Sequence, residues 1–231
     1  MENNLFLIHE GKITLDPVII FTFPTSNGRK DDLINFGVFD SILNENIVIV
    51  GIQTRDDECF YSQDLTDDEK IENLFIFLDD LQKVFKFVSD KYITTKIPIL
   101  FGCSIGGYYA HLVYMMHPNK FHCVSLSGIC DLTILDQTIN YATNIQKWKK
   151  LNPIEINICE NIYTKIISCF GMRDDLILTK NISVFYDKLK TWNYVKYYDL
   201  NHNFNSWKIM TRDIFKGNLC DFHEFRNEFY A

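Results

Sequence analysis

The chain has 231 residues, 47% of them hydrophobic, and carries 23 basic against 30 acidic side chains, which gives a formal net charge of −7. This length suits one α/β domain, the lack of a basic stripe argues against binding to nucleic acid or an anionic membrane, and no apolar run approaches the roughly 20 residues that span a bilayer. The 7 cysteines lack metal-ligand spacing and no secretory leader follows Met1, so we expect free thiols, a cytoplasmic location, and neither metal nor cofactor.

The first part of the chain alternates short apolar runs with turn residues. Residues 5–9 and 13–14 predict an opening hairpin that turns at Glu10-Gly11. Two continuous apolar runs follow, at residues 18–23 and 47–52. Runs of this kind are typical of parallel strands that are buried on both faces of a sheet.

A long helix is predicted to begin at Thr66, because Thr66-x-x-Glu69 has the pattern of a capping box. The acidic groups at residues 56–58 and 67–69 are interpreted as a solvated loop and as the start of this helix. Apolar side chains then recur at helical spacing and predict the face that packs on the sheet. They are Ile71, Leu74, Phe75, Leu78, Leu81, Phe85 and Val88.

The remaining elements continue the alternation of strand and helix. Strands are predicted at residues 97–103, 123–127, 166–170 and 195–200, and helices at 106–116, 181–190 and 207–215. This alternation predicts a mostly parallel sheet of about six to seven strands with helices on both faces, a three-layer α/β sandwich. No repeat or linker divides the chain, so we expect a single domain over residues 1–231, with room for a short helical cap over the site at 130–163.

The strongest motif is Gly102-Cys103-Ser104-Ile105-Gly106, which lies between a predicted strand and a predicted helix. In a nucleophile elbow the chain turns sharply at this point and exposes the serine on a strained backbone. Glycines lack the Cβ atoms that would collide in such a turn, and the Ile105 amide at the helix start can stabilise an oxyanion. We therefore predict that Ser104 is a nucleophile; the alternative is an ordinary tight turn with an inert serine.

A nucleophilic serine needs a histidine base that is oriented by a carboxylate. When the serine lies on such an elbow, the order along the chain is serine, acid and histidine, each after a strand. Of the 6 histidines, only His202 follows a predicted strand downstream of the elbow. His9 precedes the elbow and His223 has no strand before it, while His111, His117 and His122 are interpreted as structural or exposed.

The acid is expected in the segment Gly171-Met172-Arg173-Asp174-Asp175, which follows the strand at 166–170. Both carboxylates are candidates, because one can serve as the acid while the other caps the next helix. A second oxyanion donor is expected from the loop at 24–28, and the Ser26 amide is the candidate.

Together these motifs resemble the esterase branch of the α/β-hydrolases that includes enterochelin esterases, S-formylglutathione hydrolases and mycolyltransferases. The segments that carry the resemblance are 23–29, 35–37, 102–110, 117–121, 126–131, and His202 with Trp207. The resemblance implies an α/β-hydrolase fold, a Ser–Asp/Glu–His triad and metal-free hydrolysis or transfer of an acyl group. It assigns the acid to Asp174, three residues after Gly171, and the oxyanion amide to Ser26.

One part of the sequence departs from the family pattern. Asn201 replaces the glycine that usually precedes the histidine, and residues 203–206 separate His202 from Trp207. This difference loosens the match around the base without removing the base itself.

The sequence thus predicts a serine esterase that cleaves a small-molecule carboxylic ester or thioester through a Ser104 acyl-enzyme, with Asp174 and His202 completing the triad and Ile105 and Ser26 the oxyanion hole. Two alternatives are an acyltransferase with the same triad and an inactive binding protein with the same fold. An enzyme that uses Cys103 is disfavoured, because the residue before an elbow serine points away from the site. The sequence specifies neither the substrate nor the oligomeric state.

Overall fold

The computed structural model describes residues 5–135, 139–157, 162–175, 185 and 193–216. One sheet of 7 strands has the order β1-β3-β2-β4-β5-β6-β7. The strands are β1 (Phe6–Glu10), β2 (Val18–Phe23), β3 (Ile47–Ile52), β4 (Ile99–Cys103), β5 (His122–Leu126), β6 (Ile166–Gly171) and β7 (Asn193–Tyr198). Only β1 pairs antiparallel, with β3, and every other pair is parallel. The predicted mostly parallel sheet is confirmed.

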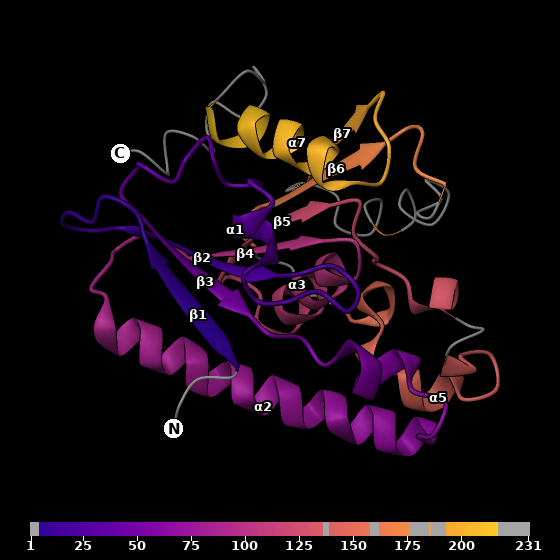
Figure 1. Cartoon of the computed structure of the whole chain (residues 1–231). Helices are drawn as coiled ribbons and strands as arrows, with labels where there is room; N and C mark the ends of the chain where they lie inside the picture. Colours follow the sequence, from indigo (N-terminus) through magenta and orange to yellow (C-terminus); the bar gives the residue numbers. More distant parts are fainter. Residues whose placement is uncertain (1–4, 136–138, 158–161, 176–184, 186–192, 217–231) are drawn as a thin grey trace.

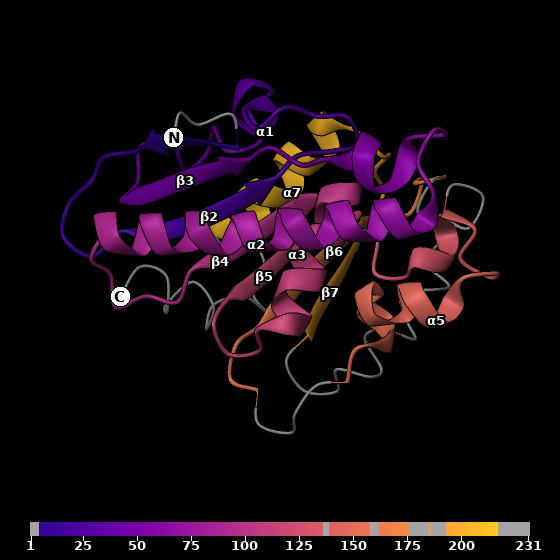
Figure 2. The same cartoon turned by 90° about the horizontal axis from the view of Figure 1, so that it is seen from below.

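Helices cover both faces of the sheet (Figures 1 and 2), so the molecule has three layers. Helices α2 (Asp67–Lys91) and α3 (Ile105–Met116) lie on one face, and α1 (Asp32–Asn35) and α7 (Phe204–Lys216) on the other. Two apolar cores fill the spaces between the layers, because alternate strand residues point to opposite faces. Ile19 and Phe21 of β2 join the core under α2 and α3, whereas Val18 and Ile20 join the core with α7.

The predicted opening hairpin is wrong, because residues 13–14 form no strand. β1 pairs instead with β3, with Phe6 opposite Ile52. The N–H groups of Gly11 and Lys12 then donate to the carbonyls of Ile47 and Glu45. After β1 the chain therefore continues alongside the start of β3 and does not fold back on β1.

The capping box at the start of α2 is confirmed. The Thr66 N–H donates to Glu69 Oε2 at 2.8 Å, and the Glu69 N–H donates to Thr66 Oγ1 at 3.4 Å. The predicted buried face is partly wrong: Phe75 is 46% exposed, while Phe77 and Val84 are buried. Phe75 lies about 100° around the helix from Leu74, and the sheet-facing stripe is centred on Leu74, so Phe75 falls outside it.

The segment that the sequence left without a shape contains short helices: η2 (Leu132–Leu135), α5 (Ile145–Trp148), η3 (Lys149–Leu151) and η4 (Pro153–Glu155). A buried polar network joins η2 to Asn152, which lies between η3 and η4. Asn152 Nδ2 donates to Asp131 Oδ1 at 3.0 Å and to the Tyr141 hydroxyl at 2.8 Å, and Asn152 Oδ1 accepts from the Leu132 N–H at 3.0 Å. α5 lies beside the first turns of α2 (Figure 1), where Lys147 pairs with Asp68.

The other predicted strands correspond to β2 to β7, and the predicted helices at 106–116 and 207–215 correspond to α3 and α7. The helix predicted at 181–190, apart from Phe185, and His223 lie outside the described residues. Within the described ranges, every helix is too short or too polar to cross a lipid bilayer.

Candidate active site

Ser104 lies at the sharp turn between β4 and α3, with φ 55° and ψ −122°. A non-glycine residue with positive φ is strained, by about 1–3 kcal/mol, so its surroundings must hold it in place. The Ser104 N–H donates to the carbonyl of Leu126 at 3.0 Å, and the Ser104 carbonyl accepts from Gly107 at 3.0 Å and from Ile129 at 3.2 Å. These backbone bonds fix the turn in the geometry of a nucleophile elbow.

Two glycines allow this turn to close. A Cβ atom on Gly102 would lie 2.0 Å from the Gly106 carbonyl oxygen, and one on Gly106 would lie 2.2 Å from that of Phe23. Both contacts are with backbone atoms, which have no room to move aside. The absence of a side chain at Gly106 thus lets the end of β2, and the loop after it, pack directly on the elbow.

His202 and Asp174 form a close pair on loops after β7 and β6. Asp174 Oδ2 lies 2.7 Å from His202 Nδ1, and the two side chains are 1% and 12% exposed, respectively. The ring of Trp207 packs nearly perpendicular to the imidazole, at 5.2 Å between centroids. Asp175, the other candidate acid, is exposed. A buried carboxylate beside Nδ1 favours the tautomer that leaves Nε2 as the base.

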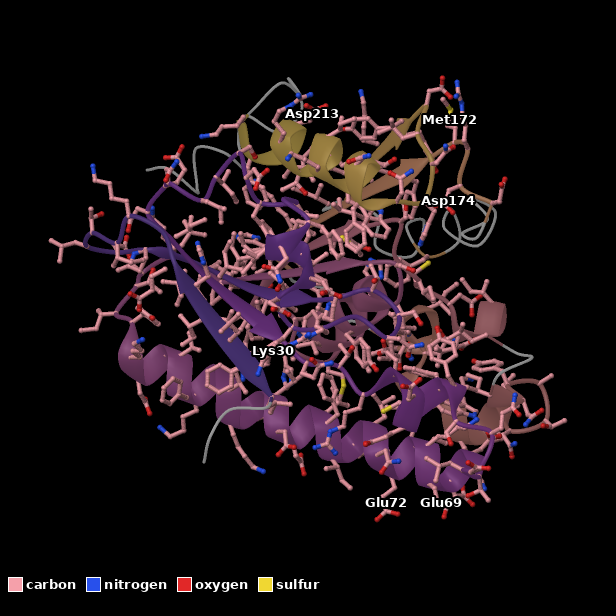
Figure 3. All side chains as sticks on the ribbon, in the orientation of Figure 1. Lys30, Glu69, Glu72, Met172, Asp174 and Asp213 are labelled. Atoms are coloured by element: carbon pink, nitrogen blue, oxygen red, sulfur yellow. The ribbon has the colours of Figure 1, made fainter. Side chains whose placement is uncertain are left out.

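Strand order brings the two parts of the site to one edge of the sheet. β4, β5, β6 and β7 are parallel neighbours, so Ser104, Asp174 and His202 all follow strands at the same carboxyl edge. Figure 3 shows Asp174 and Met172 on the side of the molecule where β6 and β7 end.

The two predicted oxyanion amides lie on the elements that meet at the elbow. Residues 25–28 form a turn in which the Gly28 N–H donates to the Thr25 carbonyl at 2.9 Å. Neither the Ser26 N–H nor the Ile105 N–H donates to an acceptor in the described part of the chain. Both donors are therefore available to a bound group, as an oxyanion hole requires.

The prediction that Asp56 lies in a solvated loop is wrong. Asp56 is 3% exposed, and its Oδ2 accepts a hydrogen bond of 3.1 Å from the Asn27 N–H. Burial raises the pKa of the carboxyl to about 6, against the smaller effects of Tyr109, Thr54 and the Asn27 amide. The available signal was position: Asp56 closely follows β3, whose carboxyl end lies at the same edge as the elbow.

A polar cavity of about 830 Å³ opens between Tyr61, the start of α2 and α5; its lining includes Thr66, Lys70 and Asn144. The Tyr61 hydroxyl lies beside the side chain of Ser26, so this cavity adjoins the loop that carries a predicted oxyanion amide. Among the described residues, no three His, Cys, Asp or Glu side chains gather in a geometry that could hold a metal ion.

Residues 44–207 match the model of the prolyl oligopeptidase family. The chain belongs to this family. No curated protein matches the sequence. The family assignment covers β3 to β7 and all three residues of the predicted triad.

Solved structures share the fold at low identity. An S-formylglutathione hydrolase from Agrobacterium tumefaciens has a TM-score of 0.72 at 13% identity, over 90% of this chain and 86% of that one. The fluorophosphonate-binding serine hydrolase FphF of Staphylococcus aureus has a TM-score of 0.66 at 13% identity, over 90% and 95%. Esterase B from Lactobacillus rhamnosis has a TM-score of 0.65 at 15% identity, over 95% and 79%.

The solved structures confirm the predicted α/β-hydrolase fold, and the family match confirms an enzyme of the serine hydrolase class. The chain is thus a serine hydrolase of this family, and its described residues form a sheet of 7 strands.

Proposed function

We propose that the enzyme hydrolyses a small-molecule carboxylic ester or thioester through an acyl-enzyme on Ser104. The observation that carries the proposal is the buried Asp174–His202 pair, which lies at the same sheet edge as the strained Ser104. A serine, a base and an orienting carboxylate in this chain order are the components of a triad.

In the first half of the reaction, His202 Nε2 takes the proton from Ser104 Oγ as Oγ attacks the ester carbonyl. The N–H groups of Ile105 and Ser26 donate to the oxyanion that forms. When this intermediate collapses, the alcohol or thiol leaves with the proton from His202. In the second half, His202 takes a proton from water, which attacks the acyl-enzyme, and returns it to Ser104 Oγ as the carboxylic acid leaves. Asp174 stays ionised and stabilises the imidazolium in both halves.

A fluorophosphonate probe tests the proposal without knowledge of the substrate, because it reacts with an activated serine. We expect stoichiometric labelling of the wild type at Ser104, located by mass spectrometry, and none in Ser104→Ala or His202→Ala. Ser127→Ala is the matched control, because Ser127, like Ser104, follows a strand and has positive φ, and it is buried. Its labelling should equal that of the wild type. Folded wild type that takes up no label would refute an active triad and favour a binding protein.

The family match supports a second candidate, hydrolysis of a peptide bond. The same acyl-enzyme would form from an amide, with an amine as the leaving group. Matched ester and anilide substrates with one acyl group separate the two candidates by the ratio of their kcat/KM values. An acyltransferase would instead give a new ester when a competing alcohol is added.

We further propose that the enzyme works in a reducing cytoplasm, without nucleic acid or a membrane as partner. Among the described cysteines, Cys59, Cys103, Cys123 and Cys169 are free and buried. Free thiols are typical of proteins in reducing compartments, where disulfides are rare.

A further inference from the structure

Asp56 lies between β3 and the π-helical turn η1 (Asp57–Tyr61), beneath the loop that carries Ser26. A buried carboxylate costs free energy unless it has partners. Its only backbone donor among the described residues is the Asn27 N–H, at 3.1 Å from Oδ2. The next residue, Asp57, is exposed, so the two adjacent acids have different surroundings.

The hydrogen bond from Asn27 fixes a turn whose backbone is strained. Asn27 has φ 54°, and the Gly28 N–H closes the turn on the Thr25 carbonyl. A positive φ at the third position, without one at the second, Ser26, is the mark of a type II turn, in which the central peptide is flipped. That peptide joins Ser26 to Asn27, and Asp56 binds its N–H. Asp56 therefore helps to fix the orientation of the turn, and with it the direction of the Ser26 N–H, together with Gln53, whose Nε2 donates to the Gly28 carbonyl at 3.0 Å.

Asp56 also faces the helix that supplies the other oxyanion amide. Tyr109 of α3 and Thr54 lie beside the carboxylate and partly offset the effect of burial on its pKa. Tyr109 is fully buried and its ring stacks on that of Phe23, at the end of β2, with 6.0 Å between centroids. The carboxylate thus lies where the turn at 25–28 and α3 come together.

We propose that Asp56 is a positioning residue that holds the turn at 25–28 so that the Ser26 N–H points at the oxyanion. Asp56 acts through the turn and touches no reacting atom. The inference rests on the proposed function, because it concerns how that reaction is accelerated. A purely structural role would lower stability and leave kcat unchanged.

Three variants test the role with an ester that the wild type hydrolyses. Asp56→Ala removes the acceptor, and we expect kcat to fall about 10²-fold with KM unchanged, because one oxyanion donor accounts for about 10²–10³ in kcat. Asp56→Asn keeps an acceptor oxygen in place and should retain kcat within about ten-fold. Asp57→Ala, the exposed neighbour, should match the wild type.

A double-mutant cycle with Ser26→Pro shows whether Asp56 acts through the Ser26 amide. Proline has no N–H and suits the second position of a type II turn, which Ser26 occupies, so the turn should keep its shape. We expect kcat of Ser26→Pro to fall about 10²-fold. Adding Asp56→Ala to it should lower kcat no further, because the group that Asp56 positions is already absent.

The outcomes separate the inference from the proposed function. Multiplicative losses in the cycle, or a wild-type kcat in Asp56→Ala, would overturn the role of Asp56 while leaving the triad intact. Hydrolysis that persists in Ser104→Ala would instead overturn the proposed function. If Asp56→Ala does not fold, Asp56→Leu, which is close in volume and lacks an acceptor, takes its place in the cycle.

Discussion

The two halves of the site are held in place by different kinds of interaction. Around Ser104 the structure depends on backbone: a strained turn, two glycines in contact with carbonyl oxygens, and amides without acceptors in the described part of the chain. Around His202 it depends on side chains, since Asp174 and Trp207 hold the imidazole from two directions. The first half is encoded by a few adjacent residues and the second by strand order. They should therefore fail in different ways when they are altered.

The largest effect is expected in the side-chain half. Asp174→Asn should lower kcat by about 10⁴-fold with little change in fold, because the amide disfavours the tautomer of His202 that acts as a base. Asp175→Asn is the matched control, since this neighbour is exposed, and its kcat should stay near that of the wild type. Steady-state kinetics on one ester measures both. Equal losses in the two variants would mean that the geometry of the Asp174–His202 pair does not govern the reaction.

The backbone half should respond in stability. In Gly106→Ala the new Cβ would lie 2.2 Å from the carbonyl oxygen of Phe23. The elbow and the end of β2 must then separate, at an expected cost of about 3 kcal/mol in the free energy of unfolding. Ile105→Val, which deletes one buried methyl group beside it, should cost about 1 kcal/mol. Urea unfolding measures both, and equal losses would show that the elbow tolerates a side chain at Gly106.

This contrast also explains what the sequence could predict. The elbow was found because close backbone contact requires glycine, and the strands because buried parallel strands are apolar throughout. His202 was found because only one histidine follows a strand after the elbow. Asp174 could be separated from Asp175 only by a family pattern, since adjacent carboxylates look alike until one is buried.

Other features depend on contacts that no local pattern records. The pairing of β1 with β3 joins segments far apart in the chain, so the opening hairpin was predicted wrongly. Phe75 was placed on the buried face of α2 because apolar residues recur near it at helical spacing, but its side chain faces outward. Asp56 looked like a solvated acid, because the turn that buries it is distant in sequence. The buried network at Asn152 was likewise unpredictable, since its partners come from separate turns.

Asp56 combines features of both halves, because its side chain holds the backbone of the turn at 25–28. Its burial should also make the stability of the protein depend on pH. Burial raises the pKa of its carboxyl from 3.8 to about 6. The folded state therefore binds this proton more tightly than the unfolded chain. The free energy of unfolding should fall as pH rises from about 4 to about 6 and stay lower above that, by about 3 kcal/mol.

Asp56→Asn removes this dependence. Relative to the wild type, the variant should gain up to about 3 kcal/mol between pH 4 and pH 8. The comparison across pH cancels any cost of the amide that does not depend on pH. Urea unfolding of both proteins at the two pH values measures the gain, with Asp57→Asn as the control at an exposed acid. A gain with retained kcat would mean that an acceptor at this position matters more for catalysis than its charge.

The smallest effect is expected far from the site, in α2. It serves as a reference for how far a loss of stability alone changes kcat. Thr66→Ala removes the capping box of α2, in which Thr66 and Glu69 bind each other's backbone N–H groups. Loss of such a cap costs about 1 kcal/mol, so the melting temperature should fall by a few degrees while kcat stays unchanged. If kcat fell as well, a modest loss of stability would by itself be enough to lower kcat. The losses in Asp56→Ala would then have to be corrected for that effect before any part of them was assigned to the oxyanion loop.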